Sequence, residues 1–254
     1  MKNTFLICRK ELRSYFASPI AYAVLALFAF LFGGIGVYSQ VAQLVRMAPQ
    51  FQMQGQPMNL NDWVIRPLLD FAATIALFLL PLITMRLFAE EKRSGTMELL
   101  LTSPVRDLEI IMGKWIGALL LYISVLAMSA LNLSFLFLWG KPDWKPVLVA
   151  YLGLILQGGC LLAIGAFISS LTRNQIVAGG ATFFVCLILY LLRLFTAYDS
   201  TLTYQVLNYL SIVTHMESFS KGVIDSKDVI FYLSMTFFAL FITSRSMESL
   251  RWRS

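Results

Sequence analysis

Six long apolar runs divide this sequence and leave few folds open to it. They cover residues 20–37, 68–85, 113–138, 147–171, 176–195 and 229–243. A helix needs about 20 residues to cross the roughly 30 Å apolar core of a bilayer, and every run except the short last one reaches the usual length. Charged residues make up only 13% of the chain, too few to cover a surface in water. We therefore expect an all-α membrane protein, a single domain over residues 1–254 with six transmembrane helices.

Lysine and arginine are unevenly divided between the two sides that six spans define, and this division predicts the orientation. Cytoplasmic loops carry the excess of these residues. Seven of the 20 lie opposite the termini: Arg46, Arg66, Lys141, Lys145, Arg193, Lys221 and Lys227. The other thirteen lie on the side of both termini, which we therefore expect in the cytoplasm. The net charge of +6 is spread over span ends rather than gathered in a patch, which argues against a nucleic-acid partner.

The sequence offers little that could perform chemistry. Its three cysteines are widely separated, and we expect them to be free thiols that pack as small hydrophobic residues. One histidine, His215, leaves little room for acid–base catalysis, and there is no H-E-x-x-H motif or other metal-ligand spacing. No G-x-x-x-x-G-K-[ST] is present to cradle the phosphates of ATP. We expect a chain that binds no cofactor and is not itself an enzyme.

The first 18 residues predict an amphipathic helix ahead of the first span. Its apolar residues recur on one helical face, away from most of the basic ones: Phe5, Cys8, Leu12, Tyr15 and Phe16. Such a helix is expected to lie in the cytoplasmic headgroup layer, and Ser18-Pro19 to end it. The alternative is a positively charged leader that only sets the topology.

A dense island of mixed charge, residues 90–104, separates the second and third spans. We expect the second span to continue as a helix through Lys92 and to be interrupted at Ser94-Gly95. A short helix from Thr96 to Leu101 then has leucines with no bilayer to enter. Ser103-Pro104 is typical of the start of the next helix. We call residues 90–104 the coupling segment. A solvated loop whose leucines pack back on the bundle fits the spacing as well as a segment whose leucines dock on another protein.

Two further features concern packing and the outer side. Small residues recur in several spans, among them Gly113 and Gly117, and allow helices to approach closely. The segment 196–228 is long yet apolar, which indicates one or two short helices that lie at the outer leaflet or dip into it. It carries His215 and Glu217, for which we expect hydrogen bonding at headgroup level rather than catalysis.

The run Phe88-Ala89-Glu90-Glu91-Lys92-Arg93-Ser94-Gly95-Thr96-Met97-Glu98-Leu99-Leu100-Leu101-Thr102-Ser103-Pro104 resembles the permease subunit of type-2 ATP-binding-cassette (ABC) exporters. The entry Lys10-Glu11-Leu12 to Phe16-Ala17-Ser18-Pro19 resembles that family too, as does the tail Leu210-Ser211, His215, Phe219 and Gly222-Val223-Ile224-Asp225. The resemblance covers nearly the whole chain and is nearest to permeases of the gliding-motility and copper-enzyme-maturation type. It has no role for the glutamine-rich loop that we expect over residues 38–67.

The resemblance implies an elbow helix at the N-terminus, six spans, a cytoplasmic coupling helix after the second span and short external re-entrant helices before the sixth. It implies a multi-pass protein of a bacterial inner membrane that works with two separate ATPase subunits, which bind ATP and magnesium, and with a second permease, identical or paralogous. The residues expected to dock the ATPase are Glu90, Glu91, Arg93, Gly95, Thr96, Glu98, Leu99, Leu100, Ser103 and Pro104. Those of the elbow helix are Lys10, Glu11, Leu12 and Phe16. Glu91 and Glu98 are expected to make polar contacts, with Leu99 and Leu100 as buried anchors.

Two other classes of membrane protein fit the sequence less well. An ion-coupled secondary transporter or channel subunit needs ionisable groups within the membrane that face a cavity. Asp70 and Arg193 are expected near span ends, so the apolar runs offer few such groups. An intramembrane enzyme would need catalytic groups that this composition does not supply. The cargo, the export direction and the identity of the second permease are not encoded in any motif of the chain.

Overall fold

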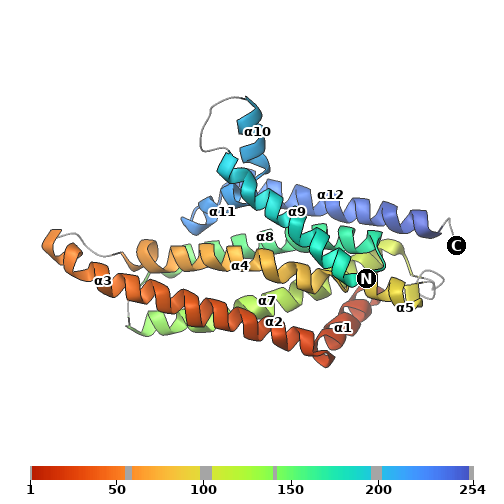
Figure 1. The fold of residues 1–254 in the computed structure, drawn as a ribbon, viewed down its shortest axis with the longest axis horizontal. Helices are drawn as coiled ribbons and strands as arrows, with labels where there is room; N and C mark the ends of the chain where they lie inside the picture. Colours follow the sequence, from red (N-terminus) through yellow and green to blue (C-terminus); the bar gives the residue numbers. More distant parts are fainter. Residues whose placement is uncertain (1, 55–58, 98–104, 140–141, 196–201, 252–254) are drawn as a thin grey trace.

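In a computed structural model, the described residues 2–54, 59–97, 105–139, 142–195 and 202–251 form an elongated bundle of helices without a strand (Figure 1). The helices are α1 (Lys2–Ala17), α2 (Pro19–Ala29), η1 (Phe30–Val37), α3 (Tyr38–Gln54), η2 (Asn61–Ile65), α4 (Arg66–Thr84), α5 (Ala89–Ser94), α7 (Asp107–Trp139), α8 (Trp144–Leu171), α9 (Gln175–Phe195), α10 (Leu202–Leu210), α11 (Ile212–Ser220) and α12 (Ser226–Arg251).

Within the described residues, six helical stretches are long and apolar enough to cross a membrane, as the sequence predicts. They are Pro19–Pro49, Asn61–Ser94, Asp107–Leu138, Trp144–Leu171, Gln175–Leu194 and Ser226–Ser249. The last is longer than the short run that marks it in the sequence, because polar residues near both its ends are also helical. The all-α fold class with six candidate spans is confirmed.

The expected loop over residues 38–67 is wrong for much of its length. The helix of the first span continues without a break, because Tyr38 has the helical angles φ −59° and ψ −46°. It then runs through Pro49 to Gln54 as α3. The second span begins at Asn61, seven residues earlier than the apolar run at Leu68. Polar side chains hide these extensions from a hydropathy reading, although glutamine is a good helix former.

The glycines of the first span lie in a widened turn of the helix. η1 is a π-helix of eight residues and contains Gly33, Gly34 and Gly36. A methyl group at Gly33 would lie 3.1 Å from the amide oxygen of Asn132, and one at Gly36 would lie 3.0 Å from the Phe71 ring. Glycine therefore lets this turn approach both α7 and α4, which is the close packing expected of small residues in membrane helices.

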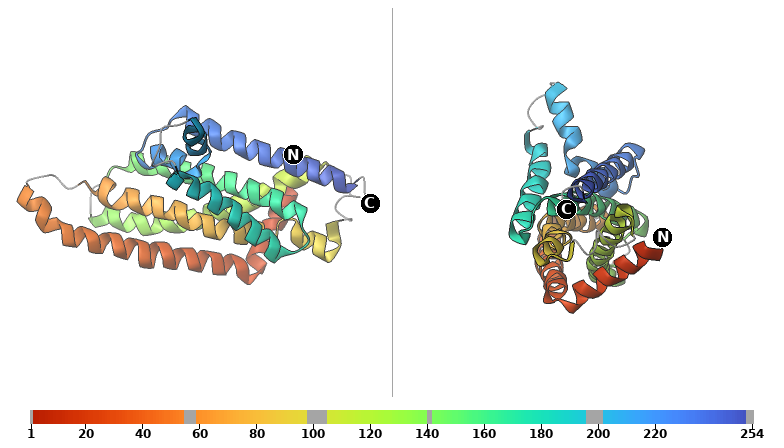
Figure 2. Two further views of the ribbon diagram at one scale, coloured as in Figure 1. Left: turned by 45° about the horizontal axis from the view of Figure 1, so that its top comes forward. Right: turned by 90° about the vertical axis from the view of Figure 1, so that its right-hand side faces the viewer.

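Helix α8 forms the centre of the bundle and packs against α4, α7, α9, α11 and α12 (Figure 2). Its sequence makes this position possible, because small residues leave room on several faces. A methyl group at Gly158 would lie 2.0 Å from the Tyr122 ring, and one at Gly165 would lie 2.4 Å from the hydroxyl of Thr84. α8 and α9 form the expected antiparallel hairpin, and the Asn174 side chain caps α9 by accepting from the amide of Ile176 at 2.9 Å.

The two ends of the bundle differ in what they carry. Both chain ends and α5 lie at one end, and α10 and α11 lie towards the other (Figure 1). Short helices are thus present in the segment before α12, as expected, although residues 196–201 lie outside the described part. α11 reaches into the bundle, because Phe219 packs on Gly153 of α8, where a methyl group would lie 2.5 Å from the phenylalanine Cβ.

His215 of α11 is buried in protein and not placed at an exposed headgroup level. Its Nδ1 lies 2.7 Å from Asp228 Oδ1 and its Nε2 lies 2.8 Å from the carbonyl oxygen of Tyr209. The imidazole also stacks on the Phe231 ring at 3.8 Å between centroids. The expected hydrogen-bonding role is therefore real, but its partners belong to α10 and α12. All three cysteines are free and buried, as predicted.

Candidate functional site

The base of the coupling segment begins with a break between α4 and α5. In a continuous helix the amides of Phe88 and Ala89 would bond to backbone carbonyls one turn earlier. Both instead donate to the hydroxyl oxygen of Ser169 on α8, each at 3.1 Å, and that hydroxyl donates to the carbonyl of Met85 at 3.4 Å. The expected continuous helix through Lys92 is therefore wrong at residues 85–88, because a side chain from α8 is inserted into the ladder.

The elbow region completes the hydrogen bonds that this break leaves open. Leu87 donates to the Thr84 carbonyl instead of the Ile83 carbonyl. The Ile83 oxygen accepts from the buried Tyr15 hydroxyl of α1 at 3.3 Å. Burial raises the pKa of that phenol, so it remains a neutral donor. α1 and the end of α4 are thus joined at the point where the helix changes direction.

The end of α5 follows the sequence prediction closely. α5 stops at Ser94, and Gly95 takes the left-handed angles φ 73° and ψ 0°, which glycine adopts without a steric penalty. The Ser94 hydroxyl donates to the Glu91 carbonyl at 3.3 Å and lies 2.8 Å from the Thr96 hydroxyl. The turn after α5 is therefore locally ordered, and it presents Ser94, Gly95 and Thr96 on the exposed surface.

Lys114 of α7 holds three helices together beneath this turn. Its ammonium lies 2.8 Å from Glu11 Oε1 of α1 and 3.0 Å from Glu91 Oε1 of α5. The Lys114 side chain is only 2% exposed, and the two carboxylates are 12% and 14% exposed. The ammonium also lies 5.4 Å from the centroid of the Phe88 ring. Lys10 approaches Glu91 at 3.6 Å from the solvent side. We call Lys114, Glu11 and Glu91 the buried triad.

The two glycines of α7 explain why α1 can come so close. A methyl group at Gly113 would lie 2.8 Å from Ile7 Cβ, and one at Gly117 would lie 2.9 Å from Glu11 Cβ. α1 therefore packs directly on α7 with Cys8 and Tyr15 buried, while Phe5 and Phe16 stay exposed. The amphipathic helix is present as predicted, but part of its apolar face contacts protein instead of lipid.

Arg86 connects the same region to the start of the first span. Its guanidinium bonds both carboxylate oxygens of Glu90, at 2.6 Å and 3.1 Å, and donates to the Ser18 hydroxyl at 2.9 Å. Ser18 is also the N-cap of α2, where its oxygen accepts from the amide of Ile20 at 3.4 Å. The Ser18-Pro19 boundary between α1 and α2, predicted from the sequence, is thus linked to the coupling segment through Arg86.

α8 and α12 complete the base of the coupling segment. The Lys92 ammonium bonds to the Ser170 carbonyl at the end of α8. The Ser170 hydroxyl in turn donates to the Ser246 hydroxyl of α12 at 3.2 Å. α5 therefore contacts α1, α7 and α8 directly and is linked to α12 through Ser170.

The expected docking residues fall into three groups. Glu90 and Glu91 face the bundle in ion pairs, although Glu90 stays half exposed. Arg93, Gly95 and Thr96 are exposed, and Arg93 forms no ion pair with any residue that the structure describes. The rest lie outside the described residues: Glu98, Leu99, Leu100, Ser103 and Pro104. Of the expected elbow residues, Lys10 and Phe16 are exposed, Leu12 is partly buried, and Glu11 belongs to the buried triad.

Sequence reasoning missed three residues of this site: Arg86, Lys114 and Ser169. Arg86 and Lys114 entered the sequence analysis only as topology charges. A lysine near the start of a long apolar run, directly after Gly113 and three residues before Gly117, was the available signal for a buried ion pair. Nothing in the sequence distinguishes Ser169 from a serine that bonds within its own helix.

The comparison with protein-family models decides what kind of protein has this arrangement. A model described as "ABC-2 family transporter protein" matches residues 5–244. The chain belongs to the ABC-2 transporter family. An ABC-2 chain of this kind is a permease, the multi-pass membrane subunit of an ABC transporter, and family membership implies an ABC ATPase subunit as its partner. No curated protein matches this ABC-2 chain.

Proposed function

We propose that this permease couples ATP hydrolysis on a separate ATPase to export of a substrate across the membrane, with the coupling segment as the docking element. The observation that carries the proposal is the buried triad, because one lysine joins the base of this segment to α1 and α7. An ordinary solvated loop has no need of a buried ion pair with two other helices, which is costly to desolvate.

In this proposal the exposed turn and the buried base have different tasks. Arg93 and Thr96 contact the ATPase, together with Glu98, Leu99, Leu100, Ser103 and Pro104 of the same segment. Glu91 acts through Lys114 as a positioning residue instead of touching the ATPase. The exposed side chain of Arg93 favours this division, since Glu91 of the same helix faces the bundle.

Closure of the ATPase pair on ATP would displace α5, and the contacts at its base would pass the displacement on. Ser169 ties α5 to α8, and Lys114 ties it to α7 and α1. Coupling of two sites requires an element with two arrangements that both sites bias. The break at residues 85–88 is a suitable hinge, because the bonds there are made by a serine hydroxyl and can be remade at another angle.

The proposal extends to the surroundings of the chain. Two ATPase subunits carry ATP and magnesium, and a second permease, identical or paralogous, completes the substrate path. The end with α5 and both chain ends faces the cytoplasm of a bacterium, and α10 and α11 form re-entrant helices on the outer side. The thirteen-to-seven division of basic residues supports this orientation. The gliding-motility and copper-enzyme-maturation type is the subgroup that the motifs of the chain favour.

Reversal of charge in the exposed turn tests the docking assignment. The variants Arg93→Glu and Glu98→Lys are expected to lose co-purification with the partner ABC ATPase, while thermal unfolding of the permease itself stays unchanged. Arg13→Glu is the matched control, since Arg13 is an equally exposed arginine of α1. If the ATPase still co-purifies with both variants, the coupling segment is not its docking element.

A further inference from the structure

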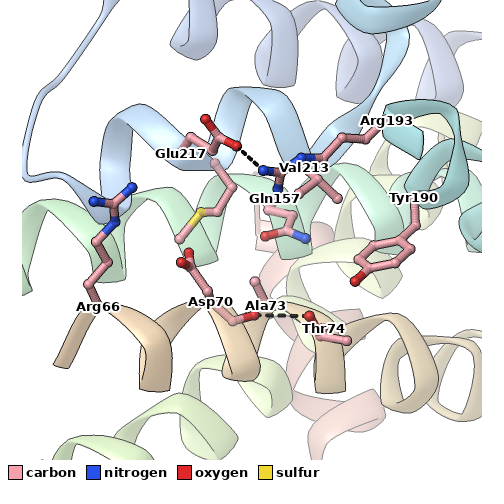
Figure 3. Close-up of a pocket in the computed structure, with 10 residues that line it drawn as sticks. Arg66, Asp70, Ala73, Thr74, Gln157, Tyr190, Arg193, Val213 and Glu217 are labelled. Atoms are coloured by element: carbon pink, nitrogen blue, oxygen red, sulfur yellow. Dashed lines mark hydrogen bonds and ion pairs between the residues drawn. The ribbon is translucent and has the colours of Figure 1, made fainter. Parts of the chain in front are cut away.

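A polar cavity of about 180 Å³ lies between α4, α8, α9 and α11, at a distance from the buried triad. Figure 3 shows its polar side chains, which come from all four helices: Arg66, Asp70, Gln157, Tyr190, Arg193 and Glu217. Arg193 forms an ion pair with Glu217 across its upper rim. The cavity is too small for a drug-sized ligand, whose pockets span about 300–1,000 Å³. It suits a compact polar group.

The cavity lies beside the first turns of α4. Asp70 follows Asn61, where the helical span begins, by nine residues, which is about 14 Å at 1.5 Å per residue. The expectation that Asp70 lies near a span end stays a prediction, because the start of a helix does not mark the edge of the bilayer. Asp70 lies two residues inside the apolar run that begins at Leu68, and an ionisable side chain within such a run points to a function.

Gln157 gives the strongest indication that the cavity binds a ligand. The residue is 2% exposed, and its Oε1 has no hydrogen-bond partner in the structure. A buried acceptor without a donor is costly, and most such groups in proteins are satisfied. The side chains of Gln157 on α8 and Asp70 on α4 point towards the same space (Figure 3). A ligand group with several N–H donors, such as a primary ammonium, satisfies both oxygens.

Arg66 supplies the opposite charge one helical turn from Asp70. It forms no ion pair within 4 Å with a described residue, whereas the second arginine of the cavity is paired with Glu217. The charges nearest Asp70 are those of Arg66, Glu217 and Arg193. A guanidinium binds phosphate in bidentate fashion. The cavity thus offers a place for an ammonium and, beside it, a place for a phosphate.

The charge balance selects between ligand classes. Arg66 and Arg193 offset Asp70 and Glu217, so the four charged side chains sum to zero. A simple anion would leave Asp70 facing added negative charge, and a simple cation would leave Arg66 facing added positive charge. A ligand that carries both an ammonium and a phosphate places an opposite charge beside each residue. We propose that the cavity is a binding site for a phosphoethanolamine group, a primary ammonium next to a phosphate, supplied by a lipid head group or by a free solute.

Binding to the purified permease tests this proposal without any ATPase or transport, so its failure would leave the proposed function untouched. In detergent free of phospholipid, O-phosphoethanolamine is expected to raise the unfolding temperature. Phosphocholine, which lacks N–H donors, and glycerol phosphate, which lacks the ammonium, are expected to bind at least tenfold more weakly. If the solute does not bind, nanodiscs test the lipid source. There the protein is expected to retain phosphatidylethanolamine in preference to phosphatidylcholine and phosphatidylglycerol.

Matched variants separate the cavity from general effects on the fold. Asp70→Asn, Arg66→Gln and Gln157→Met are each expected to weaken binding, or to reduce the lipid preference, at least tenfold. Asp62→Asn and Arg46→Gln make the same charge changes at exposed positions outside the cavity and are expected to leave both unchanged. Equal affinity of the wild type for all three solutes, together with equal retention of all three lipids, would overturn the proposal. A preference that survives the cavity variants would do the same.

Discussion

The Lys114 ammonium lies 3.0 Å from the Glu91 carboxylate across a contact that is almost closed to solvent. Lys114 belongs to the third span and Glu91 to the base of the coupling segment, 23 residues earlier in the chain. The same ammonium bonds Glu11 at 2.8 Å, so one positive charge serves two carboxylates from different helices. The contact links the element proposed to receive force to the bundle proposed to respond to it.

Replacement of Lys114 by methionine is expected to destabilise the permease strongly. Two largely buried carboxylates would then lose the ammonium between them, and removal of one partner from a buried ion pair costs about 3–5 kcal/mol. Thermal unfolding in detergent measures the loss. Lys145→Met, at an exposed position of α8, is the control. Addition of Glu11→Gln and Glu91→Gln to Lys114→Met is expected to recover part of the stability, and no recovery would contradict the triad.

The variant Ser169→Ala is expected to loosen the break between α4 and α5. The amides of Phe88 and Ala89 would lose their acceptor, at a cost of about 1–3 kcal/mol for an unsatisfied buried group. Hydrogen exchange read by mass spectrometry is expected to be faster in the peptide that contains these two residues. Ser134→Ala removes an exposed hydroxyl that bonds only within its own helix and should leave that exchange unchanged. Unaltered exchange in Ser169→Ala would show that the hydroxyl does not hold the break.

The packing of α1 on α7 predicts an unreactive thiol at Cys8. Burial, and to a lesser extent the nearby Glu11, raises the pKa of this thiol, so the reactive thiolate is scarce at neutral pH. Maleimide is expected to leave Cys8 unlabelled while it labels an Arg9→Cys variant, whose position is exposed. Gly117→Leu is expected to push α1 away and make Cys8 reactive. Rapid labelling of Cys8 in the wild type would place α1 in the headgroup layer instead.

We expect the His215–Asp228 pair to stabilise the position of α11 in the bundle. A carbonyl oxygen only accepts, so His215 Nε2 donates to Tyr209, and its Nδ1 is left to share a proton with Asp228. His215→Phe would leave the Asp228 carboxyl buried without a partner and is expected to cost about 3 kcal/mol in thermal unfolding. Asp228→Asn can still donate to Nδ1 and is expected to cost less than half as much. Equal losses in the two variants would refute this arrangement.

Local patterns in the sequence were sufficient for much of this fold. The apolar runs located six helices, Ser18-Pro19 marked the end of α1, and Ser94-Gly95 marked the end of α5. Each of these features depends on the chemistry of residues that are neighbours in the chain. Helix capping and left-handed glycine are properties of a few consecutive residues, so a sequence can show them directly.

The features that the sequence did not show depend on contacts between distant residues. Ser169 breaks a helix 80 residues earlier, and hydropathy cannot reveal which neighbour a hydroxyl will meet. Lys114 looked like a topology signal because its two carboxylate partners come from α1 and α5. The early start of the second span was concealed because its first residues are polar.

Cross-linking from the exposed turn tests the central claim most directly. In a variant without the three native cysteines, Thr96→Cys places a thiol beside Gly95 at the proposed docking end, and Lys221→Cys places one after α11 at the opposite end; both positions are exposed. A thiol-to-amine cross-linker is expected to join the Thr96→Cys permease to its ATPase, and to leave the Lys221→Cys permease unlinked. A cross-link to the ATPase from position 221 and none from position 96 would contradict both the docking element and the orientation.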